Sequence, residues 1–213
     1  MIEPVRRPIR ETTAQLIALA ALLLLSMALR LYRLDAQSFW YDEGNSARIA
    51  ERSAQLIIEG AAGDIHPPLY YLLLSAWRAV AGESEAALRG LSVLCGVLLV
   101  LFTYLLGRDM LNPRVGLIAA ALAAISPFAI YYSQEARMYV MLAFLAAAST
   151  WALVRIGDWR LEIGDWGRVA IAVLYVAATA AGLYTQYAYP FVMVAQGVCV
   201  VVALLMQRDS RAR

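Results

Sequence analysis

The sequence has no lysine, since all 18 of its basic residues are arginine, and this bias by itself points to no mechanism. Charged residues make up only 16% of the 213 residues, whereas a soluble domain usually carries about a quarter. The net charge of +2 lacks the basic excess typical of nucleic-acid binding, so we expect no nucleic-acid partner. Apolar residues reach 62% and gather in long runs, which indicates that the chain is solvated by a lipid bilayer.

Cysteine and histidine are also scarce. Cys95 and Cys199 lie inside apolar runs, at a spacing that metal ligands do not use. Free cysteine in such surroundings behaves as a small hydrophobic residue, so these two give no indication of the redox compartment. His66 is the single histidine, which limits the chemistry that imidazole can carry to one place in the chain.

Apolar runs predict an all-α integral membrane protein, a polytopic helical bundle of about six spans. We expect one transmembrane module over residues 1–213, surrounded by membrane lipids. The predicted spans are Thr13–Leu31, Leu88–Leu106, Val115–Ile130, Tyr139–Val154, Val169–Tyr187 and Phe191–Met206.

Residues 32–81 form the predicted loop between the first two spans. Within it, Ser46–Glu59 has small and apolar residues at helical spacing on one face, with Asn45 or Ser46 as the expected N-cap. Leu69–Ala81 is apolar but short of the roughly 20 residues that cross a bilayer. We therefore predict two juxtamembrane amphipathic helices lying in the interface.

Arginine clusters predict the orientation, because basic residues flanking spans stay cytoplasmic. If Leu69–Ala81 does not cross, every basic cluster but one is cytoplasmic, and the exceptions are Arg48 and Arg52 on the interfacial helix and Arg137. We predict a multi-pass plasma-membrane protein with a cytoplasmic N-terminus and with 32–81 and 131–137 outside. The clusters lie at 6–10, 108–114, 155–168 and 208–213.

Three outer segments hold the residues suited to chemistry. Asp42 and Glu43 follow an aromatic triplet, where a carboxylate is able to act as a general base, although most loop carboxylates are plain solubilising charge. His66 precedes a helix start that favours an anion, although a single histidine is more often a polar loop residue. Arg137 offers phosphate a two-pronged donor, although an arginine at a helix end often only reaches the headgroups.

Together these groups indicate chemistry on a lipid-linked phosphosugar. When the sugar leaves such a donor, the lipid phosphate gains a negative charge. Groups that bind this growing charge more strongly than they bind the substrate lower the barrier. The sequence therefore predicts glycosyl transfer to an acceptor hydroxyl or phosphate at the outer membrane face.

The three segments resemble the N-terminal signatures of the protein O-mannosyltransferase and aminoarabinose-transferase class, of glycosyltransferase family 39 type. Its members have the GT-C fold and use polyprenyl-phosphate sugars. The likeness covers about residues 10–200. The signatures are Phe-Trp-Tyr-Asp42-Glu43, His66-Pro-Pro-Leu-Tyr-Tyr, and Tyr-Tyr-Ser-Gln-Glu-Ala-Arg137-Met-Tyr139.

The resemblance implies Asp42 as the catalytic base with Glu43 supporting it, and His66 and Arg137 beside the donor phosphate. It implies a polyprenyl-phosphate sugar as donor, and a cell-surface glycan such as lipopolysaccharide, a lipid or a protein as acceptor. Relatives often carry histidine where this chain has Gln186, so a metal role there is not carried over; no cofactor is predicted, and a divalent metal stays open. Further supporting residues are Tyr70, Gln134, Glu135 and Tyr139.

Full family members are much longer, so we expect this chain to represent the N-terminal half of a longer architecture. One alternative is a truncated, inactive membrane module or a half that needs a partner. A transporter would place polar residues along its spans. These spans are mostly alanine, leucine and valine with their polar groups at the outer ends, which favours surface chemistry; the sugar and the acceptor are not indicated.

Overall fold

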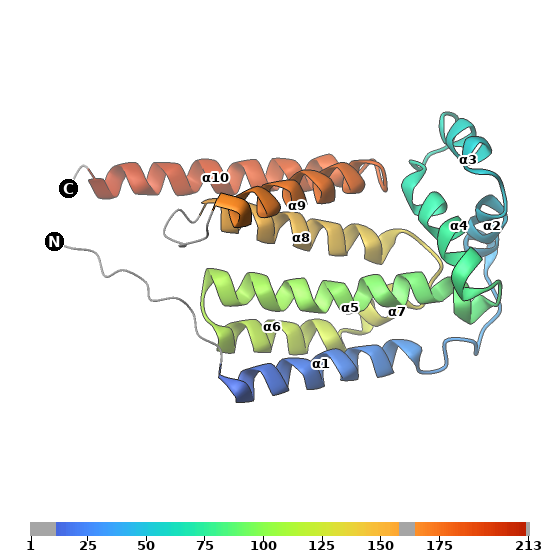
Figure 1. Cartoon of the computed structure of the whole chain (residues 1–213), viewed down its shortest axis with the longest axis horizontal. Coiled ribbons are helices and arrows are strands. Elements are labelled where there is room, and N and C mark those ends of the chain that lie inside the picture. Colours follow the sequence, from blue (N-terminus) through green and yellow to red (C-terminus); the bar gives the residue numbers. More distant parts are fainter. Residues whose placement is uncertain (1–11, 158–164, 212–213) are drawn as a thin grey trace.

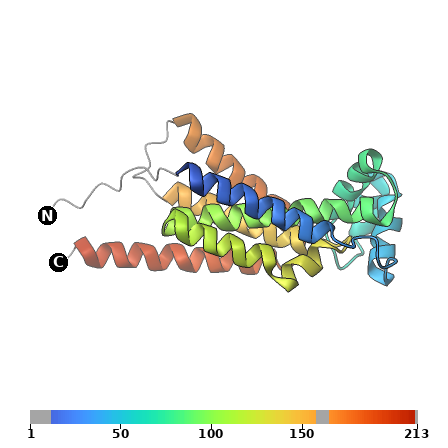
Figure 2. The ribbon, with the colours of Figure 1, turned by 90° about the horizontal axis from the view of Figure 1, so that it is seen from below.

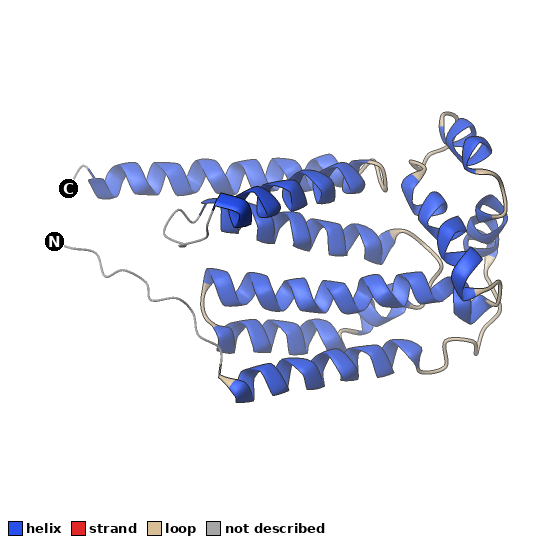
Figure 3. Ribbon diagram, in the orientation of Figure 1, coloured by secondary structure: helices blue, strands red, loops and turns tan. Residues whose placement is uncertain are grey.

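The structure, a computed structural model, describes residues 12–157 and 165–211. Long helices run roughly parallel in an elongated bundle, and three short helices lie beyond one end of it (Figure 1). Every regular element within the described ranges is helical (Figure 3). The predicted all-α membrane fold is therefore confirmed.

Five helices are long and apolar enough to cross a membrane, and a bent helix pair adds a sixth candidate, which agrees with the predicted number of spans. Predicted and observed spans overlap throughout, and the observed helices extend the predicted ones by a few residues at some ends. The five are α1 (Thr13–Leu31), α5 (Glu85–Met110), α8 (Tyr139–Gly157), α9 (Asp165–Leu183) and α10 (Tyr189–Arg211).

The sixth candidate is not the straight helix predicted over Val115–Ile130. It consists of α6 (Pro113–Ile125) and α7 (Pro127–Ser133), bent by 60° at their junction. Ser126 at the junction is extended and caps α7, and Pro127 cannot continue a helical hydrogen-bond ladder. The bend corrects the prediction and carries the end of α7 toward the following loop.

α5 lies at the centre of the described bundle, with α6 and α8 packed against it. Glycine allows α5 and α6 to approach closely, because a Cβ added to Gly116 would lie 2.7 Å from the Tyr104 carbonyl oxygen. At the end away from the short helices, Asp109 of α5 accepts a hydrogen bond from Trp151 Nε1 of α8 at 2.9 Å. These contacts fix the frame on which the polar end is built.

The short helices are α2 (Tyr41–Ala50), α3 (Ala54–Ala61) and α4 (Leu69–Ala81), which we call the hood. Both views place the hood past the ends of the long helices, whereas the start of α1 and the end of α10 lie at the other end (Figures 1 and 2). The predicted bounds of Leu69–Ala81 are confirmed.

The single helix predicted over Ser46–Glu59 is wrong, because the chain breaks into α2 and α3. Ser53 is extended, with φ −63° and ψ 153°, and its hydroxyl caps α3 by accepting from Leu56 N. The expected cap at Asn45 or Ser46 is also wrong, since α2 begins at Tyr41. The loop thus holds three short helices where two were predicted. Of the predicted basic clusters, the one at 6–10 lies outside the described residues, as do positions 158–164 of the cluster at 155–168 and positions 212–213 of the cluster at 208–213.

Candidate active site

Arg137 stands at the centre of the polar residues beneath the hood. Its Nη2 lies 3.5 Å from Asp42 Oδ2, 3.4 Å from His66 Nε2 and 3.3 Å from the Tyr139 hydroxyl. Asp42 comes from α2, His66 from the segment before α4, and Arg137 from the loop between α7 and α8. The fold therefore brings the key residues of all three sequence signatures into contact.

Asp42 occupies the first turn of α2, where the helix dipole favours a negative charge. Its side chain is 35% exposed, and the 3.5 Å contact with Arg137 is long for an ion pair. Ser46 Oγ donates to the Asp42 carbonyl oxygen at 3.0 Å, which holds the backbone of this turn in place. Asp42 thus combines a fixed backbone with a carboxylate that incoming molecules reach.

His66 is held from both sides of its ring. Nε2 faces Arg137 Nη2, and Nδ1 lies 3.2 Å from Gln186 Oε1. A guanidinium only donates, so Nε2 must accept from it, and Nδ1 then carries the proton that Gln186 accepts. These contacts orient the ring, with Nε2 toward Arg137 and Nδ1 toward Gln186.

Arg137 is almost fully buried, with 4% of its side chain exposed. Burial by itself lowers the pKa of Arg137, but the hydrogen bond and charge of Tyr139, together with Tyr71 and Asp42, raise it overall, so the residue stays cationic. Ser92 of α5 donates to the Arg137 carbonyl oxygen at 3.2 Å. Arg137 Nε is buried and has no hydrogen-bond partner among the described residues.

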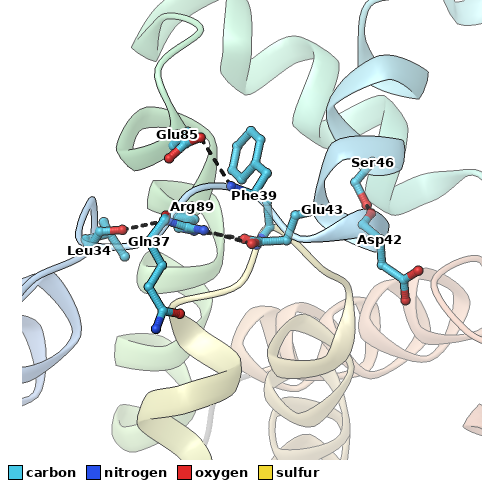
Figure 4. A network of polar contacts seen from close by, with 9 residues as sticks. Leu34, Gln37, Phe39, Asp42, Glu43, Ser46, Glu85 and Arg89 are labelled. Carbon is cyan, nitrogen blue, oxygen red and sulfur yellow. Dashed lines mark hydrogen bonds and ion pairs between the residues drawn. The ribbon is translucent and has the colours of Figure 1, made fainter.

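Glu43, next to Asp42, has a different environment (Figure 4). Arg89 of α5 donates to both of its oxygens at 2.8 Å, and the Ala136 N–H donates at 2.8 Å. Arg89 also donates to the carbonyl oxygens of Leu34 and Gln37. Figure 4 shows Asp42 pointing away from this pair. Glu43 therefore ties α2, α5 and the Arg137 loop together and is closed to substrate.

The remaining predicted residues divide between the site and its supports. Tyr70 is fully buried, with its hydroxyl 3.5 Å from Ser92 Oγ. Gln134 Nε2 donates to the carbonyl oxygens at the end of α1, at 3.1 Å for Arg30 and 2.9 Å for Tyr32, so it caps a span instead of facing the substrate. Of this group, Tyr139 forms a hydrogen bond with the Arg137 side chain, and the Glu135 carbonyl oxygen accepts from the Arg137 backbone N–H at 2.8 Å.

Glu135 is buried, and its Oε2 has no hydrogen-bond partner within the described part of the chain. Burial raises the pKa of Glu135 and the nearby Glu43 charge raises it further, whereas a hydrogen bond from Tyr131 opposes the rise. Ionisation of Glu135 therefore destabilises the folded state.

Sequence reasoning missed three residues here: Tyr71, Arg89 and Gln186. Tyr71 is buried and its hydroxyl has no hydrogen-bond partner among the residues described; burial raises its pKa while nearby Arg137 lowers it. A signal existed for each. Tyr71 belongs to the second signature, Arg89 is a charge inside an apolar helix, which is usually paired, and Gln186 lies in the run where relatives have histidine.

A small open hollow lies among the hood helices and reaches Tyr71. Its wall includes Ile49, Arg52, Ile57 and Asp64.

No group of three or more His, Cys, Asp or Glu side chains in the described ranges is arranged to hold a metal ion. Asp42 and His66 both face the Arg137 guanidinium, which would repel a cation placed between them. The residues therefore suit an anion.

Residues 65–211 match the family model described as dolichyl-phosphate-mannose-protein mannosyltransferase. The chain belongs to this family. The match includes His66 and Arg137 and begins after Asp42, so the placement of Asp42 rests on the contacts above. Membership in the mannosyltransferase family confirms the resemblance, and it implies a multi-pass membrane glycosyltransferase of mannosyltransferase type with a polyprenyl-phosphate sugar donor. No curated protein matches the chain.

Proposed function

We propose that this chain transfers a glycosyl group from a polyprenyl-phosphate-linked sugar to an acceptor hydroxyl or phosphate at the outer membrane face, with Asp42 as the base. The observation that carries the proposal is the shared contact of Arg137 with Asp42 and His66. A candidate base and a candidate phosphate-binding group are then present in one site.

The donor phosphate binds at Arg137 and His66. The guanidinium offers phosphate a planar pair of donors, and the loosely held Asp42 carboxylate occupies that place when no phosphate is bound. Phosphate displaces Asp42 and leaves it free to act on the acceptor. His66 Nε2 faces the same guanidinium, and Gln186 fixes the ring from its Nδ1 side, so His66 lies beside the bound phosphate.

For a hydroxyl acceptor, Asp42 takes the proton while the acceptor oxygen forms its bond to the anomeric carbon. The bond from this carbon to the phosphate oxygen breaks, and the polyprenyl phosphate leaves with one more negative charge. Arg137 binds that charge more strongly as it grows, which lowers the barrier. Glu43 takes no proton in this scheme; it supports the reaction by holding α2 against the Arg137 loop. Tyr70, Gln134, Glu135 and Tyr139 are proposed to support the same loop.

Orientation follows from the distribution of arginine. Arg108, Arg114 and Arg155 lie at the end of the bundle opposite the hood, and basic residues favour the cytoplasmic side. We expect Tyr41→Cys, at a hood position that is 87% exposed, to react with a membrane-impermeant maleimide on intact cells in a Cys199→Ala background. Leu111→Cys, between α5 and α6, is the control that should react only after permeabilisation. The reverse pattern would overturn the orientation.

The role of Asp42 is tested by Asp42→Asn, with Asp35→Asn as a control for an exposed carboxylate in the same loop. We expect kcat to fall by about 10²–10⁴-fold, the range typical of a lost general base. Donor affinity should stay equal or rise, because asparagine does not compete for the guanidinium. Unchanged turnover would exclude Asp42 as the base. Donor binding without turnover by the unaltered chain would favour the alternative of a module that needs a partner half.

A further inference from the structure

Arg30 of α1 is fully buried inside an apolar span, where an unpaired charge is costly. No carboxylate forms an ion pair with it in the described part of the chain. Its hydrogen bonds go to neutral oxygens of α1, α6 and α7. The acceptors are Ser26 O at 3.2 Å, Ser26 Oγ at 2.7 Å, Ala124 O at 3.2 Å, Ala123 O at 3.4 Å and Ser133 Oγ at 3.1 Å.

The bend between α6 and α7 explains these acceptors. Pro127 has no N–H, so the Ala123 carbonyl four residues earlier loses its helical donor. Helix α6 ends at Ile125, which leaves the Ala124 carbonyl without a helical donor as well. The end of a helix also carries a partial negative charge that favours a cation. Arg30 therefore supplies the donors that the bend removes.

The same guanidinium reaches the far side of the bend through Ser133. Ser133 Oγ accepts from Arg30 Nε and donates to the Ala129 carbonyl oxygen. Gly96 of α5 leaves the space for this contact, because a Cβ there would lie 2.2 Å from Ser133 Oγ and 2.6 Å from Arg30 Nε. Gln134, which follows Ser133, donates from Nε2 to the Arg30 carbonyl oxygen at 3.1 Å. The end of α1 and the end of α7 thus hold each other.

We infer that Arg30 is a positioning residue for glycosyl transfer: by bonding both sides of the α6–α7 bend, it fixes Ser133 and so places Arg137, four residues later, against Asp42 and His66. This inference rests on the proposed function, in which Arg137 binds the donor phosphate. No described contact joins Arg30 to Asp42, His66 or Arg137, so Arg30 acts through the loop that follows α7.

The geometry of the bend can be measured without turnover. Spin labels at Ile118 on α6 and Tyr131 on α7, both exposed, report the distance across the bend in a Cys199→Ala background of the full chain. We expect a narrow distance distribution in the parent and in the control Arg78→Met, which removes an arginine from the hood. Arg30→Met should shift or broaden the distribution.

Arg30→Lys separates the hydrogen-bond geometry of the Arg30 side chain from its charge. A single ammonium on a flexible stem does not reproduce the planar fork that spans Ser133 and two carbonyls. We therefore expect Arg30→Lys to broaden the distribution much as Arg30→Met does. Restoration of the parent distribution by lysine would show that only the charge matters, and it would overturn the inference.

Gly96→Ala tests the same contact while leaving Arg30 in place, so the test does not depend on the Arg30 variants folding. Gly197→Ala is its matched control, because nothing lies within 4 Å of a Cβ added there. We expect Gly96→Ala to broaden the distribution across the bend and Gly197→Ala to leave it unchanged. A folded Gly96→Ala protein with the parent's distance distribution would contradict the positioning role of Arg30.

Binding of decaprenyl phosphate in micelles connects the bend to the site. Arg30→Met and Gly96→Ala should weaken it about tenfold, the loss expected when one charge-assisted hydrogen bond is misplaced. A broadened bend with unchanged affinity would overturn the positioning role. Weaker binding in Arg30→Met but not in Arg137→Lys would contradict the proposed function instead, because it would remove Arg137 from the phosphate site.

Discussion

Two carboxylate–arginine pairs begin from adjacent residues of α2, and they occupy different environments. In the buried pair, Glu43 and Arg89 meet through two bonds of 2.8 Å, with 2% and 5% of their side chains exposed. In the open pair, Asp42 is 35% exposed and lies 3.5 Å from Arg137. The same two chemical groups thus form a closed contact in one region and a loose contact in the other.

The difference assigns separate tasks to the two regions. A buried ion pair is tolerated only when its remaining donors and acceptors are satisfied, and Arg89 meets this condition through the Leu34 and Gln37 carbonyl oxygens. The open pair is held by one long contact of 3.5 Å, which is why we propose that a donor phosphate takes the place of Asp42. The buried pair therefore maintains the frame, and the open pair is available for chemistry.

Glu43→Gln should have the largest effect on stability. Loss of the carboxylate leaves Arg89 buried without its counter-charge, which costs about 3–5 kcal/mol. Asp42→Asn should change the unfolding free energy by less than about 1 kcal/mol, because its pair is partly exposed. Denaturant unfolding in micelles compares the two variants, and equal destabilisation would abolish the distinction between the pairs.

Arg137→Lys should come next, and its effect should fall on the donor. Lysine keeps the charge but loses the planar fork, so we expect the donor KM to rise about 10- to 100-fold. Arg48→Lys, at an exposed position of α2, is the control and should leave the KM unchanged. A higher KM for the acceptor alone would move Arg137 out of the phosphate site.

Gln186→Ala should have a smaller effect, through His66. Without the Gln186 acceptor the imidazole is free to turn or to change tautomer, so turnover should fall about two- to tenfold. Gln55→Ala removes an amide that only bonds exposed Glu59 and should change nothing. Turnover and its pH profile measure the difference; identical profiles for Gln186→Ala and the parent would show that Gln186 does not orient the ring.

Glu135→Gln should have the smallest effect, and it should be stabilising. Because burial raises the pKa of Glu135, folding favours its protonated form. The stability that this form contributes is present in acid, below the ordinary carboxyl pKa of about 4.3, and is lost as the pH rises through the raised pKa. The glutamine variant avoids this loss, so its Tm at neutral pH should exceed that of the parent by about 2–4 °C.

The difference between the two melting temperatures should disappear as the pH falls. Thermal melts at a series of pH values provide the measurement, and Glu83→Gln, at an exposed end of the hood, is the control. A variant that is less stable than the parent at neutral pH would show that ionised Glu135 is well compensated in the fold.

The spans, the bounds of α4 and the choice of Asp42, His66 and Arg137 were predicted from the sequence. Apolar length is a local property, and the charges that interrupt it stand out. Three features were not predictable in this way: the break at Ser53, the 60° bend at Pro127, and the attachment of Glu43 to Arg89. Each depends on a partner that is distant in the chain or on a capping choice between equally suitable polar residues.

The amino-acid sequence by itself determined that the chain lies in a membrane and that its reactive residues belong to one end of the bundle, because hydrophobic length and charge act locally. Only the tertiary structure decided which of two adjacent carboxylates is free, which amide holds His66, and why an arginine is buried in α1. Those outcomes depend on which hydrogen-bond donors and acceptors of different helices come within bonding distance. The order of residues along the chain does not give the distances between such atoms.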